Sequence, residues 1–221
     1  MLPDHIRRRA DELYADVLNI RRHLHAHPEL SFQEFNTVSF VEEQLRKIGI
    51  TDIKRIAGTG LVAHIQGCEP ASKCIALRAD MDALPITEAN DISYVSQNAG
   101  VMHACGHDVH TSCLIGAARI LHEMRDQFTG TIKLLFQPGE ESHPGGASIM
   151  IEEGALKDPV PQAIFGLHVF PNLPAGTVGF RPGRYMASAD EIYITIHGKG
   201  GHAAQPHQTV DPIAIAALVI T

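Results

Sequence analysis

The sequence predicts an α/β fold in which helices cover both faces of a central sheet. Short apolar runs typical of buried strands alternate with longer stretches whose apolar residues recur at helical spacing. Clusters of histidine, aspartate and glutamate follow several of the predicted strands. Hydrophobic residues make up 44% of the 221 residues, which is ordinary for a globular protein with a sizeable core.

Two helices are predicted before the first strand. Residues 4–26 carry an apolar stripe at helical spacing, and this helix should end before Pro28 because the residue preceding a proline disfavours helical backbone. Ser31 and Glu34 have the spacing of a capping box, so a second helix is expected to begin there and to run to Ile48.

The central part of the chain alternates strands with helices. Strands are predicted at 52–56, 61–66, 74–79, 131–136, 163–167 and 175–180, and helices at 108–127 and 146–153. This alternation is the pattern of an α/β sheet with helices on its two faces.

The last part of the chain has a different pattern after a break at 181–184. Residues 188–197 alternate apolar and polar side chains, as a strand with one solvated face does, and 209–220 begin a helix. We therefore expect one domain over 1–186 and the incomplete beginning of another over 187–221.

Composition excludes several classes of function. The formal net charge is −7 and the basic residues are scattered, which argues against a nucleic-acid partner. No apolar run is long enough to span a membrane, and the N-terminus lacks the apolar region of a secretory signal. We expect a cytoplasmic protein whose four cysteines do not form a disulfide framework.

Four residues offer ligand atoms for a divalent metal: Cys105, His107, Glu141 and His168. Their sulfur, nitrogen and oxygen donors suit zinc or a similar cation. Taken singly, each has an ordinary structural explanation. Glu141 and His168 follow predicted strands, however, and the loop with Cys105 and His107 precedes a predicted helix. Because ligands of open α/β sheets bind at the carboxyl ends of strands, we expect the four residues to meet at that edge.

Two adjacent glutamates, Glu140 and Glu141, are the sharpest feature of the predicted site. If one carboxylate binds metal, the other can act as general base on a water molecule. Both can face the site only if the strand has ended, and Pro138 and Gly139 provide that break. Asp80 and Asp82 follow another strand as further ligands or as groups that orient a histidine.

Six segments together resemble the M20 metallopeptidases, and in particular their aminoacylase-like amidohydrolase branch. That branch includes hippurate hydrolases, N-acyl-amino-acid amidohydrolases and auxin-conjugate hydrolases. The segments are 23–31 (HLHAHPELS), 78–85 (RADMDALP), 102–108 (MHACGHD), 137–141 (QPGEE), 166–168 (GLH) and 198–204 (GKGGHAA). The resemblance implies a zinc-exopeptidase-like α/β/α catalytic domain and a smaller α+β lid that also forms dimers.

The resemblance also implies roles for individual residues. The expected ligands of two divalent ions, Zn²⁺ or Mn²⁺ with Co²⁺ or Ni²⁺ as alternatives, are Cys105, His107, Glu141 and His168. Glu140 matches the general base, and Asp82 matches the acidic residue that supports the metal site. His202 matches a lid histidine that contacts the substrate.

The expected reaction is hydrolysis of the amide bond of an N-acyl-amino acid or a related conjugate by a metal-activated water. Two alternatives stay open: a di- or exopeptidase of the same fold, and a non-catalytic module that closes one structural metal site. Family members form homodimers, continue beyond residue 221 and supply another histidine ligand there, so we expect this chain to be a C-terminally truncated fragment. The sequence leaves the acyl group, the amino acid and the native metal open.

Overall fold

A computed structural model describes residues 2–188, 190 and 192–221. The chain divides into two compact units, Met1–Pro171 and Asn172–Thr221. The domain boundary expected after residue 186 stays a prediction. Among the described residues, none of the helices has the length and apolar character needed to cross a membrane.

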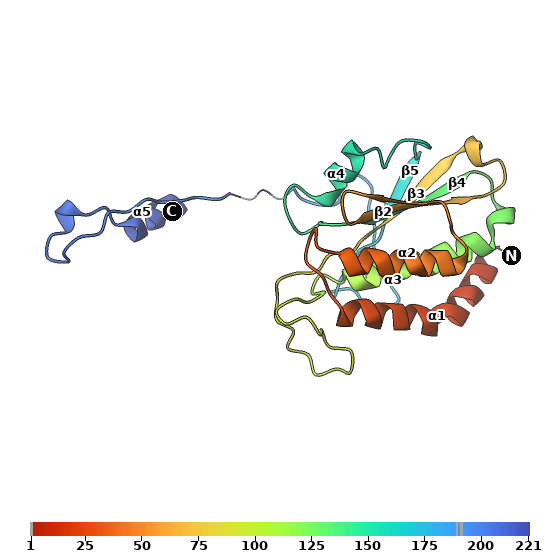
Figure 1. The fold of residues 1–221 in the computed structure, drawn as a ribbon, viewed down its shortest axis with the longest axis horizontal. Coiled ribbons are helices and arrows are strands. Elements are labelled where there is room, and N and C mark those ends of the chain that lie inside the picture. Colours follow the sequence, from red (N-terminus) through yellow and green to blue (C-terminus); the bar gives the residue numbers. More distant parts are fainter. Residues whose placement is uncertain (1, 189, 191) are drawn as a thin grey trace. The chain divides into compact units, whose positions relative to one another are not determined.

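The first unit is built on one mixed five-stranded sheet with the order β1-β2-β4-β3-β5 (Figure 1). The strands are β1 (Ile53–Ile56), β2 (Gly60–Gln66), β3 (Cys74–Asp80), β4 (Thr131–Gln137) and β5 (Ala163–Gly166). The first two neighbouring pairs in that order, β1 with β2 and β2 with β4, are antiparallel, whereas β4, β3 and β5 are parallel. The carboxyl ends of these three parallel strands therefore meet at one edge of the sheet.

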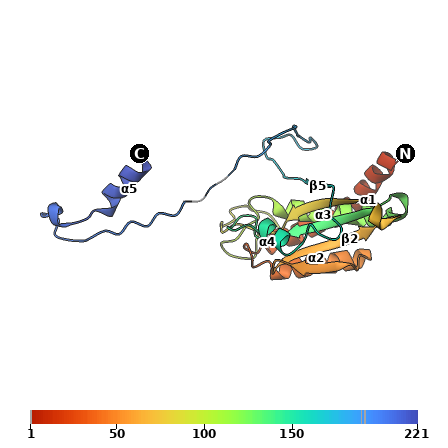
Figure 2. The ribbon, with the colours of Figure 1, turned by 90° about the horizontal axis from the view of Figure 1, so that it is seen from above.

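Helices cover both faces of this sheet, as predicted. α2 (Phe35–Ile48) and α3 (His107–Glu123) lie on one face, with α1 (Leu2–Ala26) packed against α3, and α4 (Gly146–Glu152) lies on the other face (Figure 1). Figure 2 looks onto the face that α4 covers. The fold is therefore α/β with the three layers expected from the sequence.

Within the described residues, two apolar clusters attach helices to the sheet. The larger one fills the space between the sheet and α2 and α3, around Leu45, Leu61 and Phe136, all fully buried. The smaller one joins the opposite face of the sheet to α4 through Met150 and Leu135. Burial of each such side chain contributes about 1.5–3 kcal/mol, so both faces are firmly attached to the sheet that carries the site.

The second helix begins later than the sequence predicts, at Phe35. The capping-box prediction was wrong because both of its polar side chains bind elsewhere. The Ser31 hydroxyl donates to the Asp82 carboxylate, and the Glu34 carboxylate accepts the backbone N–H of Gly139. Two residues predicted to start a helix therefore contact the loops that follow β3 and β4.

The second unit contains a short 3₁₀ turn (Pro206–Gln208) and α5 (Pro212–Ile220), which Asp211 caps by accepting the N–H of Ile213. The strand expected at 175–180 is absent there. Of the strand expected at 188–197, residues 189 and 191 lie outside the described residues, and the others are not in a strand. The physical reason is that alternation alone does not make a strand, which needs a hydrogen-bonded neighbour.

Candidate metal centre

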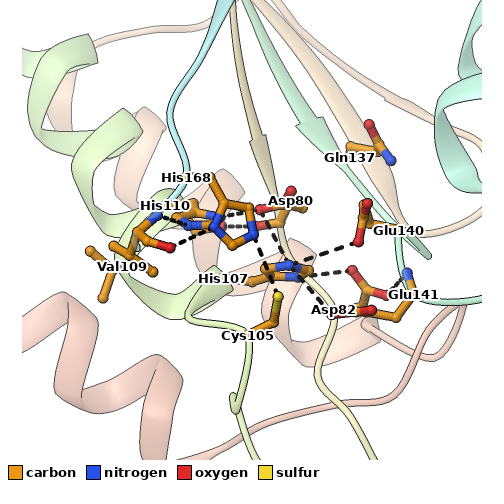
Figure 3. A network of polar contacts seen from close by, with 12 residues as sticks. Asp80, Asp82, Cys105, His107, Val109, His110, Gln137, Glu140, Glu141 and His168 are labelled. Carbon is orange, nitrogen blue, oxygen red and sulfur yellow. Dashed lines mark hydrogen bonds and ion pairs between the residues drawn. The ribbon is translucent and has the colours of Figure 1, made fainter. Parts of the chain in front are cut away.

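The loops after the three parallel strands converge on the N-terminus of α3 (Figure 3). β3 ends at Asp80, just before Asp82, and β4 ends before Glu140 and Glu141. His168 follows β5 closely. The structure thus gathers the chemically reactive side chains of distant segments at the carboxyl edge of the sheet, where ligands of α/β proteins bind.

The Cys105–His107 loop is a tight turn rather than an extended segment. Gly106 adopts a left-handed conformation with φ 88°, and His107 is already the first residue of α3. A Cβ atom on Gly106 would lie 2.4 Å from a methyl group of Val169, so the loop requires glycine for space as well as for conformation. The turn, rather than strand alternation, brings the thiol and the imidazole to the same site.

His107 is the buried centre of the cluster. Its Nδ1 lies 3.2 Å from Asp82 Oδ1, whereas its Nε2 has no hydrogen-bond partner. Carboxylate oxygens of Asp80, Glu140 and Glu141 lie 3.7–3.9 Å from Nε2 (Figure 3). A ring nitrogen facing three carboxylates is the position at which a cation is favoured.

The charge state of Asp82 fixes which nitrogen of His107 carries a proton. Burial acts to raise the pKa of Asp82, but hydrogen bonds from His107 and Ser31 outweigh it and lower that pKa. An ionised carboxylate only accepts, so Nδ1 of His107 donates to Asp82. Although burial opposes it, the Asp82 hydrogen bond and the nearby carboxylate charges raise the pKa of His107. A metal at Nε2 would take the place of the proton that these carboxylates favour there, in the orientation that a carboxylate–histidine–metal arrangement requires.

Cys105 and His168 form the other side of the cluster. The Cys105 Sγ lies 3.4 Å from His168 Nε2, and His168 Nδ1 lies 2.7 Å from the Val169 carbonyl, which can only accept. His168 Nδ1 therefore donates to this carbonyl, and its Nε2 faces the site. Burial, and next the Glu141 carboxylate, raise the pKa of the Cys105 thiol to about 12. A bound cation would reverse that effect, because a coordinated thiol is deprotonated.

The donor atoms fit divalent metal. Among the described residues, three groups of side chains each have ligand atoms within 4.8 Å of one another: Cys105 with His107 and His168, Asp80 with His107 and His110, and His107 with Glu140 and Glu141. The Glu141 Oε1 atom is buried without a hydrogen-bond partner, like the Nε2 of His107. Unsatisfied buried donors and acceptors are costly, and a cation between them would satisfy both.

Glu140 differs from its neighbour Glu141 in its environment. Its side chain keeps 40% of its surface exposed, at the open side of the cluster. Burial raises its pKa, and the charges of Glu141 and Asp80 raise it further. A carboxylate with an elevated pKa, close to the metal ligands and open to solvent, is suited to accept a proton from water.

Sequence reasoning gave no role to His110 and Arg78, which the structure places beside the cluster. His110 Nδ1 lies 2.5 Å from Asp80 Oδ1, and its Nε2 accepts the Val169 N–H at 3.0 Å. Arg78 pairs with the other Asp80 oxygen at 2.8 Å. Although burial opposes it, these contacts lower the pKa of Asp80 to about 2. The signal was present, because His110 lies one helical turn after His107 on α3.

A second buried network anchors this site to α1. Asp108, directly after His107, contacts Arg21 Nε and His25 Nδ1, each at 2.8 Å. The other ring nitrogen of His25 lies 3.0 Å from Glu88, in the long loop before Cys105. The sequence placed His25 only at a helix end, whereas it joins α1, α3 and this loop.

His202, the remaining candidate, belongs to the second unit. Its Nδ1 accepts the Ala204 N–H at 3.1 Å. Its role in contacting substrate stays a prediction.

Comparison with known proteins places the chain in a family. Residues 76–219 match the model of peptidase family M20/M25/M40. An N-acyl-L-amino acid amidohydrolase of Geobacillus stearothermophilus is 48% identical over the whole chain, which spans 59% of that relative. Thermostable carboxypeptidase 1 of Saccharolobus solfataricus is 45% identical over 203 residues, 90% of the chain and 51% of the relative.

A solved structure agrees with these relatives. A Bacillus subtilis protein described as a dinuclear metal binding peptidase from the M20 family superposes with a TM-score of 0.73 at 42% identity. The match covers 78% of this chain and 48% of that one. With the family model matching well over half of the chain and the predicted resemblance confirmed, the chain belongs to peptidase family M20/M25/M40.

Proposed function

We propose that the full-length protein is a metal-dependent amidohydrolase that cleaves the amide bond of N-acyl-amino acids or related conjugates. The observation that carries the proposal is the pairing of Glu140, a partly exposed carboxyl with a raised pKa, with the buried unsatisfied atoms of His107 and Glu141 beside it. The name of the 48% identical Geobacillus relative supports an N-acyl-amino acid as the substrate class.

The proposed ligands are Cys105, His107, Glu141 and His168, which offer one sulfur, two nitrogens and one carboxylate. Two divalent ions, zinc or manganese, would polarise the scissile carbonyl and make a water molecule more acidic when bound. The dinuclear description of the Bacillus subtilis structure supports a pair of ions.

The chain's own residues would divide the remaining work. Glu140 accepts the proton of the attacking water and then delivers it to the leaving amine. Asp82 would accept the Nδ1–H of His107 and so leave Nε2 for the metal. His202 would donate to the developing oxyanion; removing one such donor from a serine protease costs about 2.7–4 kcal/mol.

The test is the Glu140→Gln variant of the full-length protein, with Glu152→Gln on the exposed side of α4 as the matched control. We expect Glu140→Gln to keep its metal, measured by mass spectrometry, and to lose kcat for N-acyl-amino acids by about 10²–10⁴-fold. The control should match wild type in both measurements. Near-normal turnover by Glu140→Gln would refute the assignment of the base.

A peptidase activity is the second candidate, because a relative named thermostable carboxypeptidase is 45% identical. Comparing kcat/KM for N-acyl-amino acids with kcat/KM for dipeptides and blocked peptides separates the two. A non-catalytic module predicts one saturated ion and no turnover of either substrate. Such a module would need no general base, so the presence of Glu140 beside the proposed ligands favours an enzyme. Homodimerisation and a cytoplasmic location stay predictions, and sedimentation of the full-length protein tests the first.

A further inference from the structure

Glu34 is a buried carboxylate with no obvious structural need for its charge. Its side chain is fully buried, in the turn that precedes α2. One oxygen accepts the N–H of Gly139 at 2.8 Å, and the other accepts the hydroxyl of Thr59. Burying a carboxylate carries a large desolvation cost. We therefore expect a role for the hydrogen bonds that Glu34 makes.

The bond to Gly139 reaches the turn that carries the candidate base. Gly139 directly precedes Glu140 and has the left-handed φ of 52°. Its carbonyl accepts the N–H of Gly146 at the start of α4. Because both polar groups of Gly139 are bound, the peptide that leads into Glu140 has a fixed orientation.

A second carboxylate fixes the other side of Glu140. The N–H of Glu141 donates to Asp82 Oδ2 at 2.9 Å, and the same oxygen accepts the hydroxyl of Ser31 at 2.6 Å. Glu140 thus lies between two backbone N–H groups that are each held by a buried carboxylate. The backbone on both sides of Glu140 is therefore tethered.

We propose that Glu34 is a positioning residue for Glu140, acting through the backbone of Gly139 to hold the general base at its working distance. The proposal rests on the proposed role of Glu140. It explains why Ser31 and Glu34 are diverted from capping α2 to the loops around the site.

The expected effect follows from geometry. Glu34→Asp keeps the charge but shortens the side chain by one methylene, so the carboxylate no longer reaches Gly139. A misplacement of about 1 Å in a catalytic group costs on the order of 10²-fold in rate. Glu34→Gln keeps the length, and its amide can accept from Gly139 while donating to Thr59. We expect Glu34→Asp to lose about 10²-fold in kcat with little change in KM, and Glu34→Gln to keep kcat.

Glu29 provides the matched control, because it is another acidic residue of the same segment. Its carboxylate accepts the N–H groups of Asn36 and Thr37 and so caps α2 without touching Gly139. Glu29→Asp should lose stability through this cap yet keep the kcat of wild type. Equal loss of kcat in both Asp variants would reduce Glu34 to a stabilising residue and overturn the proposal.

Two further measurements on the full-length protein separate positioning from general damage. Hydrogen exchange of the Gly139 amide in the metal-free protein should accelerate in Glu34→Asp and stay slow in Glu34→Gln and Glu29→Asp. In a Glu140→Gln background, Glu34→Asp should cause no additional loss of single-turnover rate, since both act through one group. Slow exchange in Glu34→Asp, or an additional loss in the double variant, would contradict the proposal.

The outcomes also distinguish this inference from the proposed function. If Glu140→Gln turns over normally, the assignment of the base fails whatever Glu34 does. If Glu140→Gln is inactive and Glu34→Asp is fully active, only the positioning role fails.

Discussion

Asp82→Asn should weaken metal binding even though Asp82 need not touch the metal. The carboxylate is fully buried and holds three donors: His107 Nδ1, the Ser31 hydroxyl and the Glu141 N–H. Asparagine has the same size but only one accepting oxygen and an NH₂ group in place of the other. At least one of these donors then faces another donor, and His107 loses the ionised partner that fixes its tautomer.

The magnitude can be worked from these contacts. Loss of a hydrogen bond to a charged group costs about 1.5–3 kcal/mol. Removal of a carboxylate that orients a metal-binding histidine typically costs 10–100-fold in affinity, or about 1.4–2.7 kcal/mol. The two ranges agree, so we expect the dissociation constant for Zn²⁺ to rise by about 10–100-fold.

The assay is titration of the metal-free full-length protein with Zn²⁺ in competition with a chromophoric chelator. Asp91→Asn, in the exposed part of the long loop before Cys105, is the matched control and should bind like wild type. An unchanged dissociation constant in Asp82→Asn would show that Asp82 does not set the orientation of His107.

Three other predictions concern the scaffold around the site. Gly106→Ala should lower Zn²⁺ affinity and thermal stability together. Gly106 has a left-handed φ, and the added Cβ would lie 2.4 Å from Val169. Calorimetry with and without metal measures both effects. Lys133→Met should cost about 1–3 kcal/mol in urea unfolding, because the buried ammonium group donates to two carbonyls that follow α4. Burial raises the pKa of Glu34 above the ordinary 4.5, so the charged form is the less stable one in the fold. Wild type should therefore lose stability relative to Glu34→Gln as pH rises through the raised pKa. The difference in unfolding free energy between the two proteins should be smallest below pH 4.5. Urea unfolding across this pH range shows whether wild type loses stability in this direction.

The sheet was predictable because its signals are local. β4 occupies 131–137 where 131–136 was expected, since a continuous apolar run bounded by turn residues allows little else. The convergence of the loops was also predictable, because neighbouring parallel strands have their carboxyl ends at one edge of the sheet. The prediction that polar side chains at separate strand ends lie together needed only the order of the elements.

The details that failed depend on contacts between distant residues. Ser31 and Glu34 satisfy a local capping pattern, yet both bind loops that lie far along the chain, and pattern reasoning does not weigh such partners. The left-handed turn at Gly106 leaves no room for a Cβ beside Val169, and the partners of His110 come from the end of β3 and from the segment after β5. The strand expected at 175–180 lacked a neighbouring strand with which to pair.

A crystal structure of the metal-loaded full-length protein, with anomalous scattering at the metal edge, tests the proposed centre most directly. We predict two ions at the carboxyl edge of the sheet, held by Cys105, His107, Glu141 and His168, with the Glu140 carboxyl group not coordinated. A single ion saturated by protein ligands, or Glu140 bound directly to metal, would contradict it.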